Sequence, residues 1–205
     1  MSQSPTSAGK DTQSAYLEAF NQLAIKIRSG QSFSGRERNC FFLNTGGLTF
    51  ADASAAAVLD YPDDGRGSAL TDWDGDGDLD VILSNRNAPR LRFLRNDTGS
   101  RGQWVAIRLT GDPRRLSPRD AIGARVVVET ADGSRFARTL HAGDGFLSQG
   151  SKTLHFGLGA AAAIRQVTVR WPGGDREVFE GVNPGAVWHL TQGGGVRIVP
   201  SRPVV

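Results

Sequence analysis

The sequence has 205 residues, of which 39% are hydrophobic, and its 24 lysines and arginines outnumber its 21 acidic residues. That length suits one or two small domains with a buried core. The single cysteine, Cys40, excludes an internal disulfide, and no apolar run is long enough for a membrane span or a secretory signal. The compartment stays open: cytoplasmic for the chain as it stands, secreted if it is cut from a longer precursor.

The net charge of +3 and the pI of about 9.5 raise the question of nucleic-acid binding. The basic residues are almost all arginines, since Lys10, Lys26 and Lys152 are the only lysines. Aromatic residues that would stack on bases do not alternate with these arginines, and an acidic segment lies nearby in the sequence. We therefore expect a solvated, arginine-rich surface and no nucleic-acid partner.

A polar segment at residues 1–13 is followed by one predicted amphipathic helix, Ser14–Ser29. Gly30 is a natural stop for this helix. Apolar residues recur at spacings of three and four along it. This apolar face could cover a sheet or a partner helix, and we expect it to cover the protein's own sheet. These residues are Leu17, Phe20, Leu23, Ala24 and Ile27.

From Asn39 onward the pattern changes to short strands. Asn39–Asn44 and Leu48–Phe50 flank the turn residues Thr45-Gly46-Gly47, which predicts a hairpin. Three further short strands are predicted after a loop, at Ser68–Thr71, Asp80–Ser84 and Leu91–Leu94.

The most informative segment places five aspartates at alternate positions within nine residues: Asp72, Asp74, Asp76, Asp78 and Asp80. Such a concentration of negative charge indicates a bound cation, and oxygen ligands without histidine or cysteine favour Ca²⁺ over Mg²⁺. Glycines at positions 75 and 77 allow the sharp turns that wrapping an ion requires. We predict side-chain ligation by Asp72, Asp74, Asp76 and Asp80, with the backbone carbonyl of Asp78 as a fifth ligand. An EF-hand is excluded, because its twelfth position, a glutamate, is here Leu83.

The second half of the chain predicts an antiparallel β-sandwich of about seven short strands between Trp104 and Thr191. Apolar and polar residues alternate along several of these segments, and Asp-Gly and Gly-Gly turns separate them. The apolar members of three such segments are Val105, Ile107 and Leu109; Leu154, Phe156 and Leu158; and Val167, Val169 and Trp171. His155 falls on the face opposite Leu154 and Phe156, where we expect it to face solvent.

Two families resemble parts of this chain. The run Asn39–Asn44, Gly46-Gly47 and Phe50-Ala51-Asp52, with the Asp72–Asp80 segment, resembles an FG-GAP/VCBS-type repeat. The resemblance implies a propeller blade that carries one Ca²⁺ loop. Residues 121–192 resemble the ASPIC/UnbV domain that follows such repeats in cartilage-acidic-protein-like chains. The residues that carry this second resemblance are Ile122-Gly123-Ala124-Arg125-Val126, Gly143, Phe146-Leu147-Ser148-Gln149, His155-Phe156-Gly157-Leu158-Gly159 and Val169-Arg170-Trp171-Pro172-Gly173-Gly174.

The expected fold class is therefore mainly β: one propeller-blade-like calcium-binding β-unit, one antiparallel β-sandwich and an N-terminal amphipathic helix. We predict an N-terminal tail and helix at 1–37, an FG-GAP/VCBS-like calcium-binding repeat at 38–98, an ASPIC/UnbV-like sandwich at 99–195, and a C-terminal tail at 196–205.

Catalytic residues are sparse, which favours a calcium-binding interaction module over an enzyme. Its partner would be a protein, a carbohydrate or a small molecule. The alternative is a calcium-dependent enzyme or accessory protein of natural-product biosynthesis, which the UnbV resemblance implies, with Asp63 and Asp64 among the acids near a small substrate. A third hypothesis is homo-oligomerisation through the exposed edge of the single blade.

Overall fold

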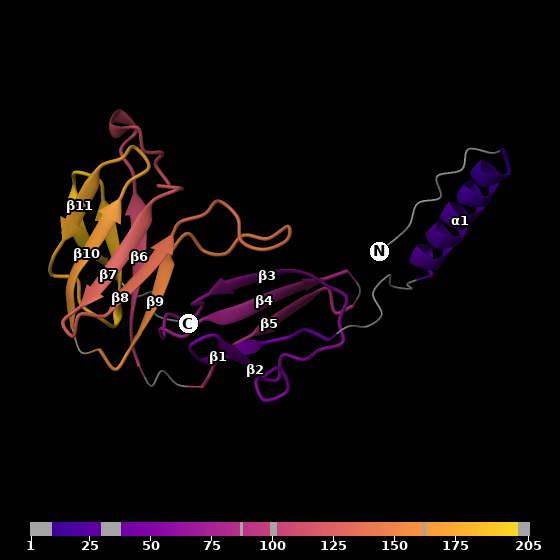
Figure 1. Ribbon diagram of the computed structural model, residues 1–205, viewed down its shortest axis with the longest axis horizontal. Coiled ribbons are helices and arrows are strands. Elements are labelled where there is room, and N and C mark those ends of the chain that lie inside the picture. The colour runs from indigo at the N-terminus through magenta and orange to yellow at the C-terminus, as the bar shows by residue number, and fades with distance from the viewer. Residues whose placement is uncertain (1–9, 30–37, 87, 99–101, 162, 201–205) are drawn as a thin grey trace. The chain divides into compact units, whose positions relative to one another are not determined.

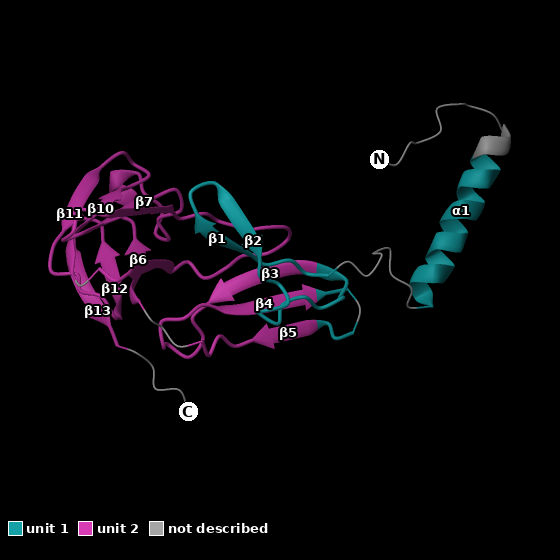
Figure 2. Cartoon of the chain, turned by 60° about the horizontal axis from the view of Figure 1, so that its bottom comes forward, with its two compact units in different colours: residues 1–65, 85–90 teal, residues 66–84, 91–205 magenta. Residues whose placement is uncertain are grey.

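The computed structural model describes residues 10–29, 38–86, 88–98, 102–161 and 163–200. The chain divides into two compact units, one made of residues 1–65 and 85–90 and the other of residues 66–84 and 91–205 (Figure 2). The second unit contains both the aspartate-rich loop and the predicted sandwich. The predicted domain bounds stay a prediction.

The first unit contains the helix and the hairpin. Helix α1 spans Lys10–Arg28 and begins four residues before the predicted start. Strands β1 (Phe42–Gly46) and β2 (Thr49–Asp52) pair antiparallel, which confirms the predicted hairpin. Gly46 and Gly47 both have positive φ, the conformation that this tight turn requires. Leu17, Phe20 and Ile27 are exposed, so the expectation that they cover a sheet stays a prediction.

The aspartate-rich loop belongs to a small sheet of three short strands. They are β3 (Gly65–Thr71), β4 (Asp80–Asn85) and β5 (Leu91–Leu94), in the sheet order β3-β4-β5. Strands β4 and β5 pair antiparallel. All three lie where the sequence predicts them, and the loop connects β3 to β4. The hairpin β1-β2 is a separate sheet, so the strands of the predicted blade lie in two small sheets.

The β-sandwich consists of two four-stranded sheets, ordered β11-β10-β7-β8 and β13-β12-β6-β9 (Figure 1). The seven strands predicted between Trp104 and Thr191 are present. An eighth, β13, extends into the segment predicted as a tail. All described pairs in these two sheets are antiparallel except β6 with β12, which is parallel. The bounds are β6 Gln103–Thr110, β7 Arg125–Thr130, β8 Arg135–Thr139, β9 Leu154–Gly159, β10 Ile164–Arg170, β11 Arg176–Phe179, β12 Ala186–Thr191 and β13 Gly195–Val199.

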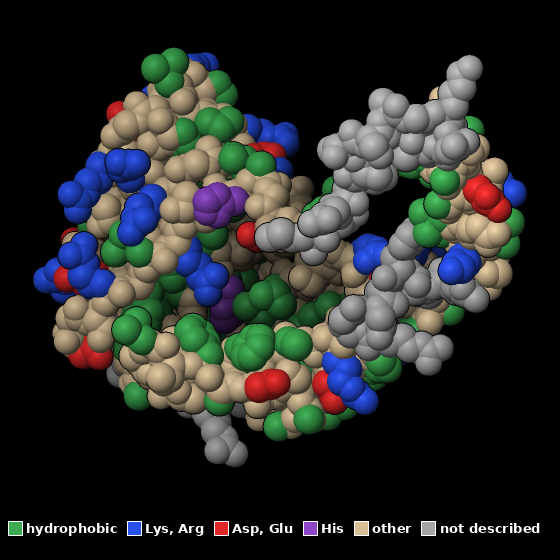
Figure 3. All heavy atoms as spheres, turned by 45° about the vertical axis from the view of Figure 1, so that its right-hand side comes forward, with side chains coloured by type: hydrophobic (Ala, Val, Ile, Leu, Met, Phe, Trp, Pro, Cys, Tyr) green, Lys and Arg blue, Asp and Glu red, His purple; other side chains and the backbone are tan. Residues whose placement is uncertain are grey.

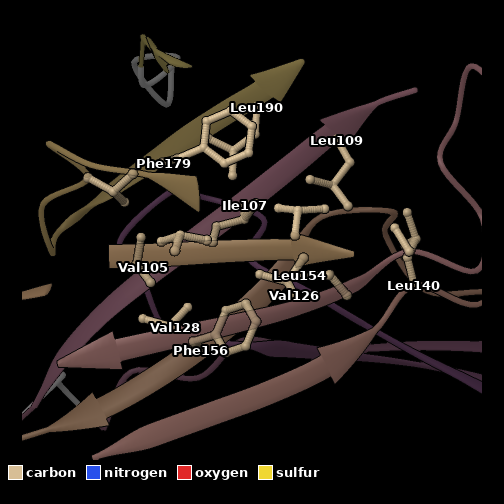
Figure 4. Close-up of a cluster of buried hydrophobic side chains, with 14 of the residues drawn as sticks. Val105, Ile107, Leu109, Val126, Val128, Leu140, Leu154, Phe156, Phe179 and Leu190 are labelled. Carbon is tan, nitrogen blue, oxygen red and sulfur yellow. The ribbon is translucent and has the colours of Figure 1, made fainter. Parts of the chain in front are cut away.

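The sandwich core comes from the alternation of side chains along these strands. Figure 4 shows side chains from both sheets meeting in one cluster. Alternate residues of one strand face the same side of a sheet, so the apolar set of each strand is buried as a group. The fully buried members include Val105 and Ile107 of β6, Val126 and Val128 of β7, Val167 and Val169 of β10, and Leu190 of β12.

The surface of the protein carries many ion pairs. Arg115 Nη1 lies 3.1 Å from Glu177 Oε1, and Lys152 Nζ lies 2.5 Å from Asp120 Oδ2. Arg165 forms an ion pair with Glu129. On the face that Figure 3 shows, lysine and arginine side chains are spread among acidic and neutral groups. Within the described residues, no helix has both the length and the apolar character needed to cross a membrane.

Replacing Ile107 tests the core. Ile107 has no exposed surface, so Ile107→Ala leaves a cavity, and we expect it to lower the free energy of unfolding by about 2–5 kcal/mol. Urea denaturation followed by circular dichroism measures this change. The matched control is Val178→Ala on β11, whose side chain is half exposed. An equal loss in both variants would contradict this assignment of the core.

His189 of β12 is held in its neutral form by its neighbours. Its Nδ1 accepts hydrogen bonds from the Arg197 guanidinium, the nearer at 2.9 Å, so the ring proton must be on Nε2. That Nε2 donates to the Thr110 hydroxyl at 2.7 Å. Burial, and then the positive charges of Arg197 and Arg108, hold the pKa of His189 below its ordinary value of 6.5.

The lowered pKa of His189 makes stability depend on pH. The unfolded chain binds a proton near the ordinary pKa, whereas the folded chain binds it only at lower pH. The contribution of this group is therefore complete above pH 6.5 and is lost as the pH falls toward the folded pKa. We expect His189→Gln to lose less stability than the parent when thermal unfolding is compared at neutral and mildly acidic pH. The exposed His141 provides the control substitution, His141→Gln, which should behave like the parent.

Candidate metal centre

The loop between β3 and β4 folds around its own carboxylates. The backbone amide of Gly75 donates to Asp72 Oδ1 at 2.7 Å, and that of Gly77 donates to Asp72 Oδ2 at 3.1 Å. The amide of Asp78 donates to Asp76 Oδ1 at 2.9 Å. Short acidic side chains that accept from amides a few residues ahead stabilise turns. Gly75 and Gly77 both have positive φ, which lets the loop turn twice within a few residues.

Three of the predicted ligands meet in space. One carboxylate oxygen from each of Asp72, Asp74 and Asp76 lies within 4.8 Å of the other two. Because Ca²⁺ binds oxygen at about 2.3–2.6 Å, two oxygens on the same ion are at most about 5 Å apart. The three carboxylates therefore already have a spacing that fits one Ca²⁺ ion. Asp72 and Asp74 are half buried and Asp76 is exposed.

The carboxylates of this cluster affect one another's ionisation. Burial raises the pKa of Asp72, the amides of Gly75 and Gly77 oppose that rise, and the charge of Asp76 adds to it. A nearby cation, the Arg95 guanidinium, lies 3.8 Å from Asp74, but it also pairs with Asp97 at 2.5 Å. Further positive charge at the centre of the three carboxylates would stabilise their ionised form.

Asp80 has a different position from the other three. It is 1% exposed, its Oδ2 accepts from the Trp73 amide at 2.8 Å, and its Oδ1 accepts from the Asn96 amide at 2.9 Å. Asp80 thus connects the start of the loop to the segment after β5. Asp78 is half buried and, like Asp80, is not a member of the group of three. Ligation by Asp80 and by the carbonyl of Asp78 stays a prediction.

Replacing Asp80 tests its backbone contacts without any metal. Asp80→Asn keeps the shape but leaves only one side-chain oxygen, and it turns an amide group toward one of the two N–H donors. We expect a loss of about 1–3 kcal/mol, the cost of a buried polar group without a partner. Thermal unfolding in EDTA measures it. Asp78→Asn, the same change at a half-buried site in this loop, should cost less; equal costs would contradict the role given to Asp80.

An exposed aromatic side chain stands beside the acidic cluster. Trp73, between Asp72 and Asp74, is 67% exposed, and its ring meets that of Phe93 edge to face with centroids 5.7 Å apart. Phe93 comes from β5 and is also exposed. The buried Asp80 fixes the Trp73 backbone by accepting the hydrogen bond from the Trp73 amide. The loop therefore presents a large aromatic surface on a restrained backbone.

Sequence reasoning missed His155 and Trp104. The sequence predicts a solvent-facing His155, but the side chain is half buried and its Nε2 lies 2.8 Å from the carbonyl oxygen of Gly77 in the loop. The Trp104 ring stacks on the His155 ring. The alternation along β9 correctly places His155 on the face opposite the core. No pattern in the sequence indicates that the aspartate-rich loop covers that face.

The comparisons with known proteins concern mainly the sandwich. Residues 114–197 match the model of the family described as ASPIC and UnbV, a range that runs from before β7 into β13. The sandwich is therefore similar to an ASPIC/UnbV domain over these residues. This confirms the second of the two predicted resemblances. The FG-GAP/VCBS resemblance of residues 39–80 is not shown.

The chain is also similar to whole proteins over more residues than the family model matches. The chain is 37% identical over 122 residues to cartilage acidic protein 1 of Xenopus tropicalis, covering 57% of this chain and 18% of that protein. The protein of the same name from Homo sapiens is 37% identical over 112 residues, covering 54% of this chain and 16% of that protein. The chain thus spans less than a fifth of the length of these relatives.

Proposed function

We propose that this protein is a calcium-binding, β-rich interaction module in which the Asp72–Asp80 loop holds the ion in a structural role. The observation that carries the proposal is the convergence of Asp72, Asp74 and Asp76, whose oxygens lie within 4.8 Å of one another. The proposal includes the assignment of residues 38–98 as one FG-GAP/VCBS-like calcium-binding repeat.

The chemistry of the donors supports calcium over other metals. The group consists of carboxylates, and hard oxygen donors suit Ca²⁺ and Mg²⁺, whereas Zn²⁺ sites generally include histidine or cysteine. Mg²⁺ requires near-ideal octahedral geometry at shorter distances, whereas Ca²⁺ accepts irregular sets of six to eight oxygens. The carbonyl of Asp78 and the carboxylate of Asp80 are the further ligands that this proposal assigns.

Bound calcium would supply positive charge to carboxylates that otherwise repel one another. Asp72 precedes Trp73 directly, and Asp80 begins β4. The ligands would therefore restrain the connection between β3 and β4 and fix the orientation of Trp73. An ion at this point would stabilise a surface and need not take part in a reaction.

The exposed aromatic pair supports a role in binding a partner. Trp73 and Phe93 present apolar surface next to polar groups, and aromatic residues of this kind are enriched at the centres of interfaces. A protein or a carbohydrate with an apolar face fits such a surface. The proposal thus gives the ion a structural role and assigns the partner contact to the aromatic rings beside it.

Thermal unfolding with added Ca²⁺ tests the ion-binding part. An ion at about 100 times its dissociation constant adds about 2.7 kcal/mol to the stability of a folded state that alone binds it. That gain raises the melting temperature by several degrees. We expect this rise with Ca²⁺, a smaller rise with Mg²⁺, and no rise for the double variant Asp74→Ala, Asp76→Ala.

The control removes the same charge elsewhere. Glu18→Ala with Glu180→Ala deletes two exposed carboxylates outside the loop, and this double variant should retain the full response to Ca²⁺. Unchanged melting of the parent at millimolar Ca²⁺ would refute the proposed metal site. An equal response in both double variants would show that the ion binds elsewhere.

A further inference from the structure

The loop contacts the sandwich at Gly77, where there is no room for a side chain. A Cβ atom added to this buried glycine would lie 2.0 Å from Trp104 Nε1 and 2.2 Å from Trp104 Cε2. Gly77 also has a φ of +97°, which residues with a Cβ rarely adopt. The indole of Trp104 therefore lies directly against the loop backbone, and glycine is required both by space and by conformation.

The carbonyl of the same glycine is bound by His155. A carbonyl oxygen only accepts hydrogen bonds, so the 2.8 Å contact requires that His155 carries its proton on Nε2. The rings of His155 and Trp104 are stacked, with centroids 5.6 Å apart and planes inclined by 14°. The Trp104 ring thus packs against Gly77, and the His155 ring donates a hydrogen bond to the Gly77 carbonyl.

Both rings project from the same face of one sheet. In the antiparallel pair β6–β9, Trp104 lies opposite Gly157 and His155 lies opposite Ala106, so the two rings are diagonal neighbours. This face is the one opposite the core. The Trp104 carbonyl accepts from the Gly185 amide at 2.7 Å, which fixes the strand at this residue. The rings are therefore mounted on paired strands and not on a loop.

The Gly77 peptide connects these rings to the acidic cluster. While its carbonyl accepts from His155, its amide donates to Asp72 Oδ2 at 3.1 Å. We propose that Trp104 and His155 are positioning residues that hold the Asp72–Asp80 loop in its ion-binding shape through Gly77. The link to ion affinity rests on the proposed function, whereas the positioning of the loop does not.

This arrangement couples the loop to the sandwich in both directions. If the rings favour the shape that binds the ion, ion binding must favour the stacked position of the rings to the same extent. Trp104 is itself a spectroscopic probe, so its fluorescence should respond to Ca²⁺. The response is isolated by comparing the parent with Trp104→Phe, which keeps a ring but removes the indole signal.

The test separates the hydrogen bond from the ring. His155→Phe keeps an aromatic ring and removes the donor, His155→Gln keeps an N–H donor and removes the ring, and Trp104→Ala removes the packing on Gly77. His141→Gln is the control, since His141 is an exposed residue elsewhere. Two quantities are measured: amide hydrogen exchange of Gly75 and Gly77 in EDTA by NMR, and Ca²⁺ affinity by titration calorimetry.

We expect His155→Phe and Trp104→Ala to speed exchange at both glycine amides by roughly two- to ten-fold, the range for loss of one hydrogen bond. The amide of Val128, in the core strand β7, should keep its rate, which distinguishes local release of the loop from general destabilisation. His155→Gln should recover part of the protection. Ca²⁺ affinity should fall in the same order.

Exchange at Gly75 and Gly77 that is unchanged in both His155→Phe and Trp104→Ala would overturn the inference, whatever the calcium result. If the parent does not bind Ca²⁺, the proposed function fails, and the exchange measured in EDTA still decides whether the rings hold the loop. Faster exchange with unchanged Ca²⁺ affinity would overturn the link to ion binding.

Discussion

Side chains along β6 and β9 point alternately to the two faces of their sheet, and the contacts of the second unit depend on this alternation. On one face, Val105, Ile107 and Phe156 enter the core between the two sheets. On the other face, Trp104 and His155 meet the aspartate-rich loop. A shift of one residue in the β6–β9 register would exchange these faces, because successive side chains point to opposite sides. Core packing and loop contact are therefore specified by the same pairing.

The carboxylates of the acidic loop lie in two different environments. Asp80 is buried, and each of its carboxylate oxygens accepts a hydrogen bond from a backbone amide, so its hydrogen bonding is satisfied within the fold. Asp72, Asp74 and Asp76 converge, and the guanidinium of Arg95, which lies near Asp74, is also engaged by Asp97. One set of identical residues thus includes a carboxylate that shapes the loop and carboxylates that converge as a candidate ion site. Alternation in the sequence alone does not separate the two.

Local patterns predicted the strands well, because hairpin turns and alternating apolar residues act over a few positions. The hairpin at Gly46-Gly47, the strand Leu91–Leu94 and the seven strands of the sandwich follow from such patterns. Contacts between distant segments were missed for the opposite reason. Nothing near His155 in the sequence indicates that its ring contacts Gly77. The parallel pairing of β6 with β12 likewise joins two strands of one sheet that are far apart in the sequence. Burial of Asp80 likewise depends on the distant Asn96 amide.

The parallel neighbours β6 and β12 impose an order on events during synthesis. Thr110 and His189, which bond across this pair, are 79 residues apart, and His155 follows Gly77 by 78. At roughly 5–20 residues per second, a ribosome needs about 4–16 s to add such a length of chain. For that interval the acidic loop is complete while its hydrogen bond from His155 does not yet exist. The edge of β6 that pairs with β12 is likewise open until β12 is made. An unpaired strand edge at this stage exposes backbone N–H and C=O groups that can pair with another chain.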